Sequence, residues 1–215
     1  MLGIGLLAAG IAIVLSTRLA KAATRKLAAA LEAEGFTAVL EPTDDQRAAT
    51  LEGMSPLALF ESPGTLHWFA WRKIDGIKLP AVVLQHSHIV GSGKYAREHF
   101  RTLVAGPVAQ AKPEIWMRRP KAGIYNLQGT ATAPDVLVGD EKFDAALLVQ
   151  CPGDATAPRR LLTQKVREFI LAGPKRESWV LARGYACCIF HNDIAAEGLR
   201  VMLSRARRMA EMWKQ

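Results

Sequence analysis

Four of the five histidines lie in a stretch whose pattern predicts three antiparallel strands. Residues 66–73 are rich in aromatic side chains, and Asp75-Gly76 follows them as a two-residue turn. Residues 77–90 form the second predicted strand, Gly91–Lys94 the second turn, and residues 95–104 the third strand. Pro80 fits this meander only at a sheet edge or a bulge, because proline donates no backbone hydrogen bond.

The two turns predict that these histidines share one face of the meander. A four-residue loop at Gly91–Lys94 places His86 opposite His99, and His88 falls on the same face because strand side chains repeat every two residues. A two-residue turn at Asp75-Gly76 places His67 opposite Leu84 on that face too. Glu98 then points the other way.

Imidazoles this close together bind zinc or another borderline metal, so His86, His88 and His99 are candidate metal ligands. The same cluster also fits a proton-sensitive patch or a plain solvated strand face. A register error of one residue on either strand scatters the cluster.

Other catalytic patterns are weak. Gly91-Ser92-Gly93-Lys94 resembles part of a phosphate loop, but His88 stands where that motif needs its first glycine, Tyr95 follows the lysine, and a strand follows the turn. Cys187 and Cys188 precede His191, but neighbouring strand residues diverge, which argues against a thiol nucleophile. The three cysteines, which include Cys151, fit reduced thiols. We therefore expect no enzymatic activity and no cofactor.

The first 17 residues predict a membrane anchor. An uncharged apolar run of roughly 25 Å, as a helix, is a short transmembrane span. A cleaved secretory signal and a buried helix are the alternatives, but a signal carries its cations before the apolar run. Four cations with no acid among them follow the run: Arg18, Lys21, Arg25 and Lys26. This basic collar predicts a single pass of a bacterial inner (cytoplasmic) membrane, with the N-terminus outside and the soluble domain cytoplasmic.

The chain of 215 residues carries a formal charge of +8. Besides the collar, a second group of cations lies near the C-terminus: Arg200, Arg205, Arg207, Arg208 and Lys214. Anionic lipid headgroups account for both groups. No aromatic platform, zinc-finger spacing or recognition helix points to nucleic acid, the other common polyanion. We expect the bilayer, its anionic headgroups and membrane-protein partners, and no nucleic acid.

The remaining elements predict an α+β fold: a mainly antiparallel sheet with flanking helices. Residues 18–35 should form a basic juxtamembrane helix, 36–121 a β-rich half, and 135–215 an α+β half. In the β-rich half we expect one helical turn within residues 43–55 and short strands at 36–41, 57–60 and 114–118. Residues 122–134 connect the halves. In the second half we expect a strand at 145–151, one helix from about 156 to 172, and a hairpin around Gly184.

The chain closes with a predicted amphipathic helix. Its apolar stripe predicts a core-facing helix, or alternatively a face that binds a partner helix. The stripe alternates spacings of four and three: Ala195, Leu199, Met202, Ala206, Met209 and Trp213.

Residues 57–213 resemble an uncharacterised bacterial family of membrane-anchored proteins, known as domains of unknown function. The resemblance rests on the Gly91–Lys94 turn, the Asp-x-x-Phe-Asp strand opening at Asp140, Phe143 and Asp144, the Leu161-Leu162-Thr163 helix, and the closing helix. It implies a shared fold and supplies no activity.

These observations predict a non-catalytic, membrane-anchored scaffold or accessory subunit of a larger membrane complex. A small-ligand or metal-binding sensor and an unrecognised membrane enzyme are the alternatives.

Overall fold

The computed structural model describes residues 22–54, 64–90, 92–108, 113–119, 134–182, 184–191 and 194–213. No helix in these ranges is long and apolar enough to cross a membrane, and the predicted anchor at residues 1–17 lies outside them. The predicted collar cations Arg18 and Lys21 also lie outside. The strand expected at residues 57–60 falls in another undescribed range.

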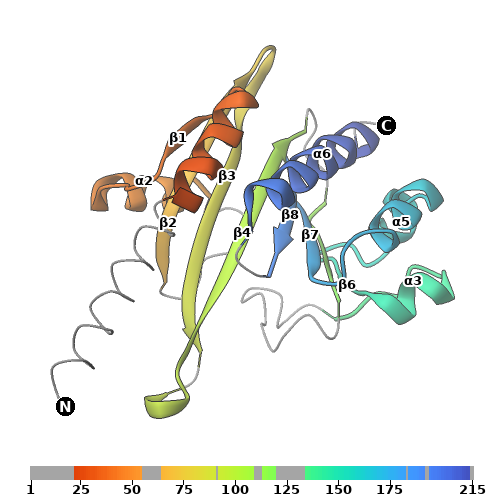
Figure 1. Cartoon of the computed structure of the whole chain (residues 1–215). Coiled ribbons are helices and arrows are strands. Elements are labelled where there is room, and N and C mark those ends of the chain that lie inside the picture. The colour runs from red at the N-terminus through yellow and green to blue at the C-terminus, as the bar shows by residue number, and fades with distance from the viewer. Residues whose placement is uncertain are drawn as a thin grey trace, which may run out of the picture.

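One eight-stranded sheet carries the fold, in the order β1-β2-β3-β4-β8-β7-β5-β6, and all its strand pairs are antiparallel (Figure 1). The strands are β1 (Thr37–Val39), β2 (Thr65–Ile74), β3 (Ile77–Val90), β4 (Arg97–Pro107), β5 (Ile115–Arg118), β6 (Leu148–Gln150), β7 (Glu177–Ala182) and β8 (Tyr185–Phe190). The helices are α2 (Asp44–Met54), α3 (Glu141–Ala146), α4 (Ala157–Leu161), α5 (Gln164–Leu171) and α6 (Ala196–Trp213), with a further helix at residues 22–33 and a 3₁₀ turn at Gly93–Tyr95. The predicted α+β class, a mostly antiparallel sheet with flanking helices, is confirmed.

The sheet joins the two predicted halves of the chain. β4 pairs with β8 from Thr102↔Phe190 to Pro107↔Tyr185, and β5 pairs with β7 and β6. Strands that precede residues 122–134 and strands that follow them therefore belong to one hydrogen-bonded sheet, in which β5 lies between β7 and β6.

Two apolar cores lie on opposite faces of this sheet. The larger one packs the sheet against the helix at residues 22–33 and against α3, α4, α5 and α6, while the smaller one includes Met54 of α2. The predicted stripe of α6 is core-facing, as expected: its buried members are Leu199, Met202, Ala206, Met209 and Trp213. β3 and β4 alternate between the cores, with Val83 and Val104 on the helix side and Leu84 and Leu103 on the other.

Three elements differ from their prediction. The expected strand at 145–151 is shortened to β6, because α3 occupies residues 141–146. The single helix expected from about 156 to 172 is two helices, since the backbone leaves the helical region at Leu162 and Thr163. Residues 44–54, for which one helical turn was expected, form the eleven-residue helix α2.

A buried ion pair fastens α6 to the sheet and to α5. Glu177 of β7 has a side chain only 2% exposed, and the Arg205 guanidinium donates to both its oxygens, at 2.6 and 2.7 Å. Trp179 Nε1 donates to the same carboxylate at 2.5 Å. Arg205 also donates to the Phe169 carbonyl at 3.1 Å and lies 4.2 Å from the centre of the Phe169 ring.

Gly173 leaves the room that this arrangement needs. A Cβ atom there would lie 2.3 Å from Arg205 Nη2 and 2.6 Å from Glu177 Oε1. The short segment between α5 and β7 is therefore shaped around the ion pair.

We expect Arg205→Ala to destabilise the fold by about 3–5 kcal/mol, because it leaves the Glu177 carboxylate buried without its cation. Urea unfolding of the full chain in mild detergent, followed by tryptophan fluorescence, measures the change. Arg160→Ala is the matched control, since Arg160 pairs with Asp154 at the surface at 3.4 Å and should cost less than about 1 kcal/mol. Equal losses for the two variants would contradict the assignment.

Candidate functional site

The histidines of the meander divide between the two faces of the sheet. β3 and β4 pair His88 with His99 and His86 with Arg101. The predicted pairing of His86 with His99 is wrong by two residues, because six residues, 91–96, connect the strands instead of four. A shift of two keeps the face, so His86, His88 and His99 do share one, as predicted.

His67 lies on the opposite face, contrary to prediction. The Asp75-Gly76 turn has the expected two residues, with Ile74 opposite Ile77 and Gly76 at a φ of 74°. Bulges between Arg72 and Ile74 and between Leu66 and Trp68 then shift the register, so that Phe69 faces Leu84. The first bulge lies beside Pro80, which is where a proline is tolerated in a sheet.

On the helix side of the sheet, His67 joins a short polar chain. Its Nε2 lies 2.7 Å from Ser87 Oγ, and the Ser87 hydroxyl donates to Glu98 Oε1 at 2.5 Å. His67 and Glu98 approach to 3.6 Å and pair ionically only when the imidazole is protonated. Ser87 is 1% exposed, so its hydroxyl is a structural link here and not an accessible nucleophile.

On the other face, a cation accompanies the histidines. Arg101 Nη2 lies 3.2 Å from His88 Nε2. Because a guanidinium has no acceptor, it donates, and His88 must accept with the lone pair that would otherwise bind a metal. Ring centres are 6.5 Å apart for His86 and His88 and 6.1 Å for His88 and His99. Among the described residues, no group of three or more His, Cys, Asp or Glu side chains is placed to hold a metal ion.

Burial favours the neutral form of three imidazoles, those of His86, His88 and His191. It is the largest cause lowering the pKa of His86, His88 and His191 from 6.5 to about 4, and the charge of Arg101 adds to it in each case. Sequence reasoning did not place His191 here. His191 directly follows β8 and lies on this face, where its Nε2 is 2.9 Å from Ser178 Oγ.

The three cysteines are buried free thiols, as expected. Burial raises the pKa of Cys187 and Cys188 well above the usual range, which disfavours the reactive thiolate. Cys187 and Cys188 belong to opposite cores, so they diverge as the strand geometry predicts.

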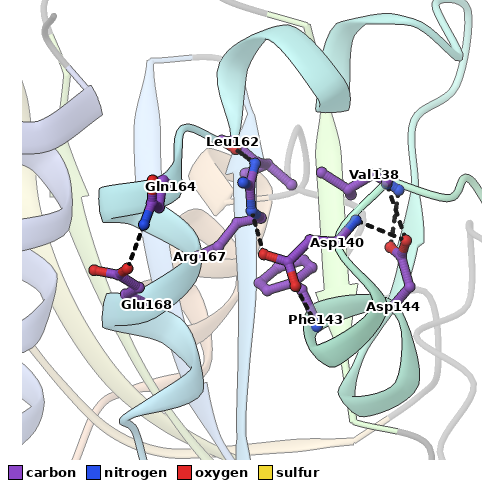
Figure 2. Close-up of polar contacts among 9 residues, drawn as sticks. Val138, Asp140, Phe143, Asp144, Leu162, Gln164, Arg167 and Glu168 are labelled. Carbon is purple, nitrogen blue, oxygen red and sulfur yellow. Dashed lines mark hydrogen bonds and ion pairs between the residues drawn. The ribbon is translucent and has the colours of Figure 1, made fainter.

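The Asp140, Phe143 and Asp144 motif opens a helix and not a strand (Figure 2). Asp140 is the N-cap of α3, where its carboxylate accepts from the Phe143 N–H at 3.1 Å and from Arg167 of α5 at 2.9 Å. Asp144 accepts from the backbone N–H groups of residues 138–140 at 2.8 to 3.2 Å. The hydrogen bonds from Phe143 and Arg167 lower the pKa of the Asp140 carboxyl. The motif therefore holds α3 and α5 together and has a structural role.

The helix at residues 22–33 lies over the sheet beside α6. Its far end is fastened by an ion pair of 2.5 Å between Glu34 and Arg207, which lowers the pKa of Glu34, and by Arg72, which donates to the Glu34 carbonyl at 2.7 Å. Its near end borders a hollow of about 660 Å³. The hollow is lined by residues of this helix, of the sheet and of the start of α6, among them Ala23, Lys26, His67, Trp68, Gln85 and Ile194.

Two predicted collar residues, Arg25 and Lys26, lie exposed at this near end. Lys26 also lines a second hollow together with Arg200 and Glu197 of α6. Arg200, near the start of α6, therefore adds a cation beside the collar, which sequence reasoning missed because the two segments are far apart in the chain.

Comparison with known proteins supports the fold. The sequence matches no protein-family model and no curated protein. The structure is similar to the crystal structure of the mycobacterial trehalose monomycolate transport factor A, with a TM-score of 0.56 at 13% sequence identity. The similarity covers 88% of this chain and 93% of that one. At this identity it shows a shared fold.

We expect the fold to lose stability as pH falls from about 6.5 to about 4. A histidine whose pKa is about 4 in the folded chain and 6.5 in the unfolded one favours the folded state fully above 6.5. As the pH drops through that window, the unfolded chain binds the extra proton, with a slope of at most about 1.4 kcal/mol per pH unit for each histidine.

Thermal unfolding measured at several pH values between about 7 and 5 checks this expectation. His86→Gln should flatten the dependence, and Ser92→Ala in the exposed turn should leave it unchanged. A pH profile that His86→Gln does not alter would contradict the assignment of His86.

Proposed function

We propose that this chain is a membrane-anchored, non-catalytic accessory or scaffold subunit of a membrane transport assembly. The observation that carries the proposal is the similarity of fold to a mycobacterial transport factor over nearly the whole of both chains. The apolar run at residues 1–17 and its cationic collar supply the proposed anchor.

The candidate site is consistent with a role without catalysis. The polar groups of the candidate site have structural partners: His88 with Arg101, Ser87 with Glu98, and Asp140 with Arg167. The cysteines are buried and their thiols are disfavoured as nucleophiles. The buried groups thus stabilise a rigid body, as a scaffold requires.

The proposal also includes the topology. The collar should keep the described domain in the cytoplasm of a bacterial cell, attached to the inner membrane by one span with its N-terminus outside. The partners are then the bilayer, its anionic headgroups and other membrane proteins.

We expect membrane-protein partners to co-purify with the tagged full chain when its native membranes are extracted in a gentle detergent. A different single-span protein, tagged and extracted in the same way, is the control for non-specific capture. Identification of the co-purified proteins by mass spectrometry is the measurement. Recovery of a lone monomer would overturn the proposed role in an assembly.

We expect a cysteine at Asp75, exposed in the β2–β3 turn, to react with a membrane-impermeant maleimide only after spheroplasts are lysed. A cysteine at Leu2 should react in intact spheroplasts, because the proposed topology places it outside. Labelling of the Asp75→Cys variant before lysis would overturn the topology.

A further inference from the structure

The β3–β4 hairpin extends beyond its neighbouring strands. On one side the pairing of β2 with β3 ends at Thr65↔Ser87, and on the other the pairing of β8 with β4 ends at Thr102↔Phe190. β3 and β4 continue together to Val90↔Arg97 before the 3₁₀ turn. Figure 1 shows this end of the hairpin projecting past the rest of the sheet. We call the described residues 88–90 and 92–99 the hairpin tip.

The hairpin tip exposes apolar and cationic side chains together. Ile89 is 71% exposed and Tyr95 is 73% exposed. Lys94 Nζ lies 5.2 Å from the centre of the Tyr95 ring, and Arg97 is exposed at the start of β4. Ile89 lies opposite Glu98 in the ladder, and Tyr95 lies against Lys94. Single exposed apolar residues are ordinary, but two of them on a hairpin that also carries Lys94 and Arg97 match the composition of protein at a membrane interface.

The hairpin tip lies at the same end of the domain as the start of the helix at residues 22–33. Ala23 and Thr24 line the same hollow as His67 and Gln85, which lie on the tip side of the sheet. Ala23 and Thr24 belong to the start of the helix at residues 22–33, and the other end of this helix lies by the β2–β3 turn. There the Glu34 carbonyl accepts from Arg72, and Phe36 borders the same groove as Ile74 and Ile77. In Figure 1 the start of this helix and the hairpin tip accordingly face the same side.

Further cations lie at this end of the domain. Arg25 and Lys26 are exposed on the first turns of the helix, and Arg200 is exposed on the first turns of α6. Glu197 lies beside Arg200, and Glu98 accepts from Ser87 on the helix side of the sheet. On the other face, α2 adds Asp44, which pairs with Arg47, and Arg47 donates to the Leu66 carbonyl. The hairpin tip itself carries two cations, Lys94 and Arg97, and one acid, Glu98.

We propose that the hairpin tip docks on the anionic headgroup region of the membrane, as a second contact beside the anchor. Tyr95 and Ile89 enter the interface, and Lys94 and Arg97 bind acidic headgroups. The occupant is the bilayer because the tip combines positive charge with exposed apolar side chains on the side from which the anchor would arrive. This inference rests on the proposed membrane anchoring and adds the orientation of the domain on the bilayer.

A fluorophore at the tip tests this docking. The full chain with Ser92→Cys is labelled with an environment-sensitive maleimide dye and reconstituted into vesicles that carry lipid-attached quenchers. The native cysteines are buried, so the unmodified chain serves as the labelling blank. Asp75→Cys, in the turn at the opposite end of the sheet, is the matched position. Vesicles contain phosphatidylcholine alone or phosphatidylcholine with phosphatidylglycerol.

With phosphatidylglycerol present, we expect about threefold more quenching at Ser92 than at Asp75 and a blue-shifted emission at Ser92. Ile89→Ser with Tyr95→Ser, and separately Lys94→Gln with Arg97→Gln, should each abolish most of that difference. Trp71→Ser with Lys73→Gln, a similar pair near the β2–β3 turn, should preserve it.

Flotation of the same vesicles separates the two proposals. A chain that floats with the vesicles but shows equal quenching at Ser92 and Asp75 overturns the docking and leaves the anchor intact. A chain that does not float overturns both. Quenching at Ser92 that is the same without phosphatidylglycerol, or unaffected by the variants at the tip, overturns the role given to these four side chains.

Discussion

The ion pair between Glu177 and Arg205 is the contact on which the arrangement of the helices depends. A carboxylate that is 2% exposed is costly to bury, and it is offset here by a two-point hydrogen bond from Arg205 and a third donor on Trp179. Because Arg205 also contacts the Phe169 ring and carbonyl, one guanidinium sets the positions of α5, α6 and β7 at once. Apolar packing alone allows a helix to slide along the sheet, whereas directional hydrogen bonds of this kind resist such sliding.

Arginine side chains also join neighbouring elements at the ends of the other helices. Arg119, which follows β5, donates to the carbonyls of Ile170, Leu171 and Gly173 at the C-terminus of α5, at 3.1 to 3.4 Å. Asp140 and Arg167 join α3 to α5, and Arg207 joins α6 to Glu34. The cations that sequence analysis assigned to lipid headgroups thus fall into two groups. Arg205 and Arg207 bind within the fold, while Arg25, Lys26 and Arg200 are exposed at one end of it.

Strong local signals in the sequence predicted their elements well. Asp75-Gly76 predicted its two-residue turn, and the regular stripe of α6 predicted both the helix and its buried face. α3 was missed because six residues are too few to show helical periodicity, although the cap formed by Asp140 was a usable signal. The position of His67 was missed because Pro80 indicated an edge or a bulge without giving the change of register, and a bulge moves a side chain to the other face. Arg101 reaches the histidines through the register of the β3–β4 hairpin, whereas His191 reaches this face only through the long-range pairing of β4 with β8.

The attachment of the helix at residues 22–33 has a mechanical consequence. Its far end is held by Arg207 of α6 and Arg72 of β2, and its buried residues Leu27 and Leu31 pack into the larger core. A tensile force entering at residue 22 is therefore transmitted to α6, to β2 and to the larger core, and does not fall on the three-residue edge strand β1 alone. A tilt of the helix at residues 22–33 would therefore turn the whole domain with it.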